Sequence, residues 1–179
     1  MLIGFALLGG AWSVNTADVA SAQASPAYPT PADRDQDGLS DPKDACPASP
    51  GDLPNGCPSR LQADVRGGWR ANALFSQLLF LTVKAQLGSR IVLHCAGKRG
   101  VCGFKTRTIR STTKLLTGLT RYFKGRRVFR AGTTITVRVT RSRQIGLYER
   151  VVTQRGRRLP RVVNRCISTK GVVSPCSSA

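Results

Sequence analysis

The chain has 179 residues, of which 41% are hydrophobic and only 6% aromatic, so it can hold one modest core and is too short for a large multidomain enzyme. Its formal net charge is +19, and most of its 28 basic residues are arginine. The planar guanidinium of arginine suits phosphate, sulfate and carboxylate groups.

The chain opens with the apolar run MLIGFALLGGAW, which is too short to span a bilayer and leads into the small-residue stretch VASAQASP. This order is typical of a secretory signal peptide, and Ala22 and Ala24 fit the small residues that signal peptidase requires. We predict a signal peptide over 1–24 and a Pro- and Ala-rich linker over 25–32. The alternative is a buried N-terminal strand or helix.

The next segment, DRDQDGLSDPKDACP (33–47), holds most of the acidic residues of the chain. Acids fall at positions 1, 3, 5, 9 and 12 counted from Asp33, with Gly38 at position 6. Calcium takes six to eight oxygen ligands, and a glycine at this point permits the sharp turn of a calcium-binding loop. Position 12 is Asp44 in place of the Glu of an EF-hand, and no amphipathic helices flank the loop, so an EF-hand is excluded. The alternative is a solvated linker rich in Asp and Gly.

The same segment resembles the thrombospondin type 3 repeat, whose pattern D-x-D-x-D-G-x-x-D-x-x-D-x-C-P it matches at every defining position, within residues 33–58. The resemblance implies an extracellular module that binds Ca²⁺ through the side chains of Asp33, Asp35, Asp37, Asp41 and Asp44 and the carbonyl of Leu39. It also implies a disulfide between Cys46 and Cys57. Repeats of this family usually occur in arrays and serve in adhesion or as stiff spacers, whereas this chain has a single copy.

Six cysteines at short spacings indicate disulfides and an oxidising compartment. Their grouping favours three local bridges, within the pairs Cys46 and Cys57, Cys95 and Cys102, and Cys166 and Cys176. A zinc site is disfavoured because the chain has no C-x-x-C pair and only one histidine.

Residues 61–179 are expected to form a small β-sandwich-like domain, which makes the chain mainly β. In TTITVRVT (133–140), hydrophobic and polar residues alternate as in a half-buried strand. Further strands are predicted over 77–86, 90–95, 104–110 and 145–152. Over 112–123, hydrophobic residues recur at helical spacing and predict one or two helical turns.

This region also resembles an uncharacterised basic β domain with two disulfides, found in secreted proteins of high-GC bacteria. The resemblance rests on GSRIVLHCAGKRGVCGF, FRAGTTITVRVTRSRQIG and VVNRCISTKGVVSPC. It implies pairing of Cys95 with Cys102 and of Cys166 with Cys176, and it brings no known activity.

From Arg60 onward the chain is strongly basic, with Asp64 and Glu149 as its only acids. The densest clusters predict sites for an anionic cell-wall or matrix polymer at Lys124, Arg126, Arg127, Arg130, Arg155, Arg157, Arg158 and Arg161. The alternative is a solvated basic face. Sequence-specific nucleic-acid binding is not expected, because no recognition motif or aromatic stacking platform is present.

We predict that the chain is not an enzyme. Outside the acidic loop, the acidic residues and histidine of the predicted mature chain are Asp52, Asp64, Glu149 and His94, and His94 is expected on the polar face of a strand. The sequence therefore predicts a secreted or cell-envelope calcium-binding protein of structural or adhesive type, without a membrane span in the mature chain. The alternative is a cationic module for anionic polymers, in which calcium only orders the linker.

Overall fold

The computed structural model describes residues 32–97, 101–111, 115–125 and 127–176. The predicted signal peptide and all but the last residue of the predicted linker lie outside these residues.

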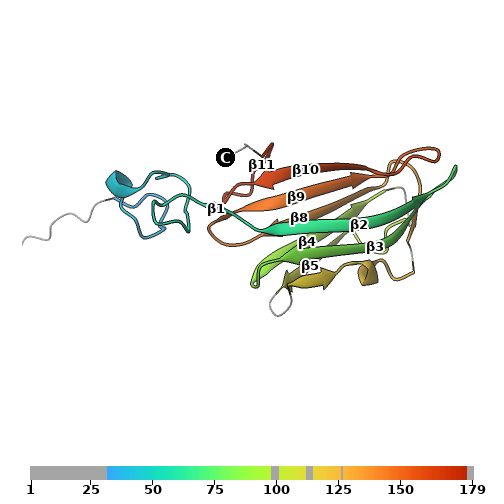
Figure 1. Cartoon of the computed structure of the whole chain (residues 1–179), viewed down its shortest axis with the longest axis horizontal. Helices are drawn as coiled ribbons and strands as arrows, with labels where there is room; N and C mark the ends of the chain where they lie inside the picture. The colour runs from blue at the N-terminus through green and yellow to red at the C-terminus, as the bar shows by residue number, and fades with distance from the viewer. Residues whose placement is uncertain (1–31, 98–100, 112–114, 126, 177–179) are drawn as a thin grey trace, which may run out of the picture. The chain divides into compact units, whose positions relative to one another are not determined.

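The described residues form β-strands joined by turns, with two short 3-10 helices (Figure 1). The strands are β1 (Ser59–Arg60), β2 (Ala63–Ala71), β3 (Ser76–Ala85), β4 (Ser89–Ala96), β5 (Thr106–Ser111), β6 (Leu116–Gly118), β7 (Val128–Phe129), β8 (Thr134–Thr140), β9 (Gln144–Val152), β10 (Arg161–Ile167) and β11 (Val173–Ser174). The 3-10 helices are η1 (Asp41–Lys43) and η2 (Thr120–Phe123). The prediction of a mainly β chain is confirmed.

The strands make two sheets. The larger has the order β11-β10-β9-β8-β4-β5, and β1 pairs with the start of β9. The smaller has the order β2-β3-β6, and β7 pairs with β3. The described pairings are antiparallel, apart from the parallel pairing of β1 with β9.

Both sheets contribute side chains to one hydrophobic core. In β8, Ile135, Val137 and Val139 are fully buried. Threonines and Arg138 alternate with them on the other face of the strand, where Thr136 is buried as well. The smaller sheet contributes residues such as Leu81 and Val83 to the same cluster. Burial of these apolar side chains is the main favourable term in folding this domain.

Of the one or two helical turns predicted over 112–123, the described residues hold one, the 3-10 helix η2. Leu116–Gly118 is strand β6, which pairs with Thr82–Lys84 at the edge of β3, and only η2 remains helical. The Thr120 hydroxyl accepts a hydrogen bond of 2.8 Å from the Leu81 amide. The segment thus makes a hydrogen bond to the neighbouring strand β3, where a helix would make hydrogen bonds to its own preceding turn. Tertiary pairing has overridden the local hydrophobic spacing. Residues 112–114 of this prediction lie outside the described residues.

Three disulfides join Cys46 to Cys57, Cys95 to Cys102 and Cys166 to Cys176. They agree with the local pairing that the cysteine spacing favoured, and they fit an oxidising environment. Over the described part of the chain, helices are too short or too polar to cross a membrane.

Candidate metal centre

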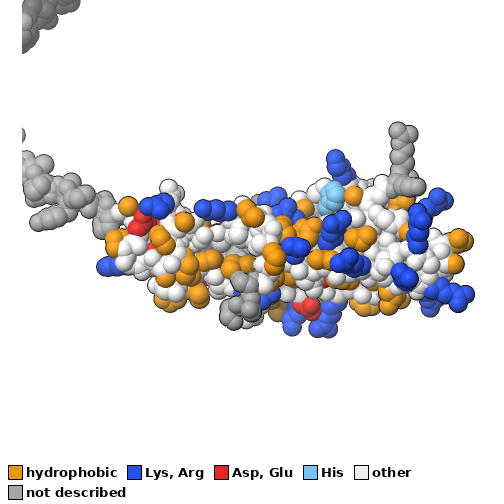
Figure 2. Space-filling model, turned by 90° about the horizontal axis from the view of Figure 1, so that it is seen from above, with side chains coloured by type: hydrophobic (Ala, Val, Ile, Leu, Met, Phe, Trp, Pro, Cys, Tyr) orange, Lys and Arg blue, Asp and Glu red, His pale blue; other side chains and the backbone are white. Residues whose placement is uncertain are grey.

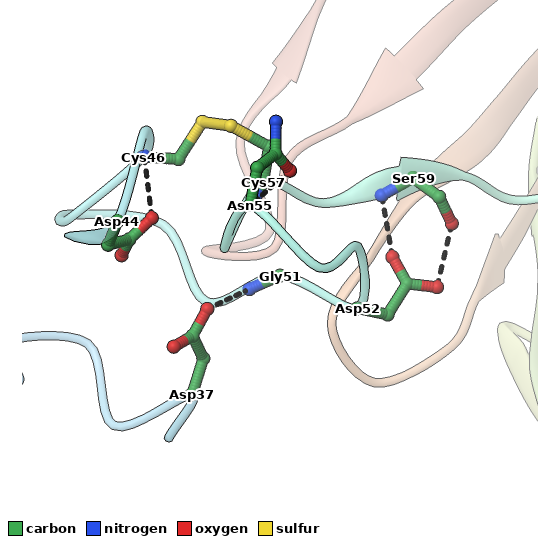
Figure 3. Close-up of a disulfide and its surroundings, with 8 residues drawn as sticks. All are labelled: Asp37, Asp44, Cys46, Gly51, Asp52, Asn55, Cys57 and Ser59. Atoms are coloured by element: carbon green, nitrogen blue, oxygen red, sulfur yellow. Dashed lines mark hydrogen bonds between the residues drawn. A yellow bond between two sulfur atoms is a disulfide. The ribbon is translucent and has the colours of Figure 1, made fainter. Parts of the chain in front are cut away.

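The segment 33–58 has no share in the hydrophobic core. Its buried residues are Asp44, Gly51 and Gly56, so apolar packing does not hold its shape. The Cys46–Cys57 disulfide and a set of hydrogen bonds to aspartate side chains take that role (Figure 3).

Three aspartates converge at the start of this segment. The carboxylates of Asp33, Asp35 and Asp37 each offer an oxygen, and these oxygens lie within 4.8 Å of one another. The Asp33 carboxylate accepts hydrogen bonds from the amides of Gln36 (2.8 Å) and Gly38 (3.0 Å), which curl the chain around it. Gly38 has φ +99°, a left-handed conformation that glycine adopts without strain.

Asp37 connects this group to the disulfide loop. Its carboxylate accepts hydrogen bonds from the amides of Leu39 (2.9 Å) and Gly51 (3.1 Å), the latter across the segment (Figure 3). These bonds, with the nearby charge of Arg143, lower the pKa of Asp37. The Asp37 side chain is therefore ionised and fixed in position at neutral pH.

Asp35 has an oxygen that its protein neighbours leave unsatisfied. Its Oδ1 accepts from the Asp37 amide at 3.3 Å, whereas Oδ2 is buried without a hydrogen-bond partner among the described residues. A buried carboxylate oxygen without a partner costs free energy unless a proton or cation compensates it. This atom, beside two further carboxylates, is the strongest sign of a cation site in the segment.

The other predicted ligands, Asp41, Asp44 and the carbonyl of Leu39, are not part of this group of three aspartates, and their ligand roles stay predictions. Asp41 accepts a hydrogen bond from the Arg34 amide at 2.9 Å and forms an ion pair with the Arg34 side chain at 3.7 Å. Asp44 is only 8% exposed; its Oδ1 accepts from the Cys46 amide at 2.6 Å, and its Oδ2 is buried without a partner among the described residues. Leu39 is half-buried and donates its amide to Asp37.

Arg143, in the turn between β8 and β9, fastens the acidic segment to the β domain. Its guanidinium donates to the carbonyl oxygens of Asp37 (3.0 Å) and Gln36 (3.3 Å). These contacts join residues more than a hundred positions apart, and nothing in the local sequence around Arg143 signals them.

A second contact lies at Asp52. Its carboxylate accepts from the amide (2.6 Å) and the hydroxyl (2.7 Å) of Ser59 (Figure 3). It also accepts from the side-chain amide of Gln144 at 2.7 Å. Burial acts to raise the pKa of Asp52, but these hydrogen bonds outweigh it and the pKa is lowered. Asp52, outside the predicted ligand set, thus has a structural role at the start of β9.

The predicted polymer-binding residues all lie on the surface where the structure describes them. The exposed members are Lys124, Arg127, Arg130, Arg155, Arg157, Arg158 and Arg161, and Arg126 lies outside the described residues. The Thr153 hydroxyl donates to the carbonyl of Arg130 at 2.7 Å, which brings the two sequence clusters to the same end of the domain. His94 is half-buried in β4 on the side of the strand opposite the core, the polar face expected for it.

Glu149 is a buried acid that the sequence does not distinguish from an exposed one. It lies on the inward side of β9, opposite the buried Val137, and only 6% of it is exposed. Burial, together with the negative charge of Asp64, raises the pKa of Glu149 to about 7.

We expect Glu149→Gln to stabilise the protein above neutral pH. Because the folded state holds the proton to about pH 7 and the unfolded chain releases it near pH 4.5, wild-type stability should fall between these values as pH rises. The variant should gain on the order of 2 kcal/mol at pH 8 and nothing at pH 4, as measured by denaturant unfolding at both pH values. Equal gains at pH 4 and pH 8 would contradict the ionisation argument. Asp52→Asn, the same acid-to-amide change at a carboxylate whose pKa is lowered, should instead destabilise the protein at pH 8.

Comparisons with known proteins found no family model, no curated protein and no solved structure that matches this chain. The resemblances to the thrombospondin type 3 repeat and to the basic β domain therefore stay predictions from the sequence.

Proposed function

We propose that residues 33–58 form a calcium-binding module, held on a sandwich-like β domain, in a secreted or cell-envelope protein of structural or adhesive type. The observation that carries the proposal is the convergence of Asp33, Asp35 and Asp37 within 4.8 Å, with Asp35 Oδ2 buried and unsatisfied. The three disulfides support an oxidising location.

The chemistry of the donors fits calcium better than a softer metal. The converging atoms are carboxylate oxygens, which hard cations prefer, and the cysteines nearby are bonded to each other as a disulfide. Asp33, Asp35 and Asp37 would hold the ion, and its charge would relieve the repulsion among their carboxylates. Asp44 supplies a further unsatisfied oxygen within the same segment.

Calcium would act on the structure through Asp37. The side chain of this residue belongs to the converging group and also bonds to Gly51, and its carbonyl accepts from Arg143. An ion that fixes Asp37 would thereby favour both the closed disulfide loop and its contact with the β domain. This coupling supports a structural role for the ion over a catalytic one.

Calorimetric titration of calcium into the oxidised protein tests the proposal. We expect saturable binding of about one ion per chain, in the micromolar to millimolar range of extracellular modules. Asp35→Asn, which keeps the shape and removes the charge of the unsatisfied carboxylate, should weaken binding by about tenfold or more. Asp64→Asn, an equal charge change on β2, is the matched control and should bind as the wild type does. The absence of binding to the wild type, or an equal loss in both variants, would refute the proposal.

A further inference from the structure

We propose that the outward face of the larger sheet binds an extended acidic polysaccharide. The proposed site shares only Arg161 with the basic clusters that the sequence singles out, and it does not depend on the calcium module. It follows from the pairing register of four strands.

The register places four arginines on one diagonal of this face. Arg161 of β10 pairs with Val152, two residues from Arg150 on β9. Arg150 pairs with Thr136, two residues from Arg138 on β8, and Arg138 pairs with Val92, two residues from Arg90 on β4. Residues two apart on a strand point to the same side of a sheet. From each arginine to the next, the line therefore passes to the neighbouring strand and two residues along it.

The spacing of this diagonal suits a linear polyanion. Diagonal neighbours in an antiparallel sheet lie about 7–8 Å apart, so the four positions span roughly 20–25 Å. Arg138 is fixed by a hydrogen bond of 3.1 Å from its guanidinium to the carbonyl of Gly171. Arg165 extends the face beside Tyr148, with which it pairs directly.

Acidic side chains are missing from this face among the described residues. Glu149, in the same strands, points inward to the core side, and the ion pairs of the described chain involve Arg34 and Arg66 only. Figure 2, which shows one side of the molecule, has many basic side chains and few acidic ones. The guanidinium groups of the face are therefore free of internal carboxylate partners.

Two shallow hollows follow the line of arginines. One lies over β9 and β10 and is lined by Tyr148, Arg150, Arg161 and Arg165 among others. The other lies beyond Gly171 and is lined by residues that include Arg90 and Lys170. A flexible chain laid along the diagonal would enter both.

Hydroxyl groups and a scarcity of aromatic rings favour a polysaccharide over a nucleic acid. Thr134 and Thr140 of β8 are partly exposed on the outward side of the strand, where they can exchange hydrogen bonds with sugar hydroxyls. Tyr148 is the one aromatic residue among the outward positions of β4, β8, β9 and β10, so successive bases would find no stacking platform. Sulfate and carboxylate groups of the polymer share the chemistry that arginine binds.

Binding to heparin and to polygalacturonate, measured with the oxidised protein in EDTA, tests the site. The face variant Arg150→Gln/Arg161→Gln/Arg165→Gln should weaken binding roughly 10- to 100-fold and flatten its salt dependence. The matched control, Arg155→Gln/Arg157→Gln/Arg158→Gln, makes the same charge change in the β9–β10 connection, where the sequence alone predicts polymer binding. Because the proposed site is the sheet face, this control should lose about twofold or less. Stronger binding of heparin would identify sulfate as the preferred group, and stronger binding of polygalacturonate would identify carboxylate.

Three results would overturn the proposal. Neither polymer binds the wild type; or both variants lose affinity equally, which would assign binding to net charge; or single-stranded DNA binds as tightly as the polysaccharides and with the same dependence on the face arginines. Unchanged melting temperatures of both variants would show that lost binding is not lost folding.

Discussion

Replacing Cys46 and Cys57 with serine should abolish calcium binding while leaving the β domain folded. The segment that these cysteines close contributes no side chain to the hydrophobic core, so the disulfide is its main covalent restraint. A bridge over so short a loop typically stabilises by about 2–4 kcal/mol, more than the few hydrogen bonds of the segment are expected to replace. Calorimetry with calcium should show at least about a tenfold loss of affinity, and limited proteolysis should cut the segment first.

The matched control is Cys166→Ser/Cys176→Ser, which opens a loop of similar length that runs from the end of β10 to just past β11. It should lower the melting temperature of the β domain and leave calcium affinity unchanged, because the acidic segment makes its contacts with β9 and the turn before it. If each double variant lowered both the calcium affinity and the melting temperature of the β domain, the acidic segment and the β domain would have to fold as one cooperative unit.

Phe123→Ala should be the most destabilising single substitution considered, with a loss of about 3–5 kcal/mol. Phe123 is fully buried at the end of η2, and its ring packs against those of Phe104 (centroids 5.3 Å apart) and Phe129 (5.6 Å). Phe129 in turn meets Trp69 of β2 at 5.9 Å, so the cavity would open at the centre of an aromatic cluster. Urea or guanidinium unfolding gives the change directly.

Phe80→Ala provides the same chemical change at a position that is 48% exposed. It should cost less than half as much, since its ring leaves water only in part and rests on the surface of Gly68. Equal costs for the two variants would mean that the aromatic cluster around Phe123 does not anchor η2 to the sheets.

The strands that the sequence predicted are those in which one face meets the core. TTITVRVT alternates because Ile135, Val137 and Val139 point inward, and β8 begins and ends within one residue of the prediction. β2 was not predicted, because in ADVRGGWRA the alternation is confined to two short halves on either side of Gly67 and Gly68. Its register shifts between Gly68 and Trp69, and the ring of Phe80 occupies the place of a side chain at Gly68. Because glycine has no side chain, a glycine that accommodates a neighbour's ring adds nothing to the alternation of hydrophobic and polar residues that predicts a strand.

Some features of the candidate sites could likewise be predicted from local sequence, whereas others depend on tertiary structure. The convergence of Asp33, Asp35 and Asp37 follows from spacing within a few residues, which is why the sequence could predict it. The contact of Arg143 with the same segment and the diagonal of arginines on the larger sheet depend on tertiary contacts and strand register. Arg90 and Arg161 are 71 positions apart, and only the pairing of the strands between them places both on one line.

The parallel pairing of β1 with β9 determines how a force applied to the N-terminal side of the chain is transmitted to the β domain. Ser59 lies opposite Gln144 and Arg60 opposite Ile145, so the first sheet contact along the path of the force is two residues long. The disulfide joins Cys46 and Cys57, which are 11 positions apart, and prevents the chain between them from being pulled out to its extended length of roughly 36–40 Å. Under tension the residues before Cys46 can extend, but while the disulfide is intact the loop from Cys46 to Cys57 cannot lengthen.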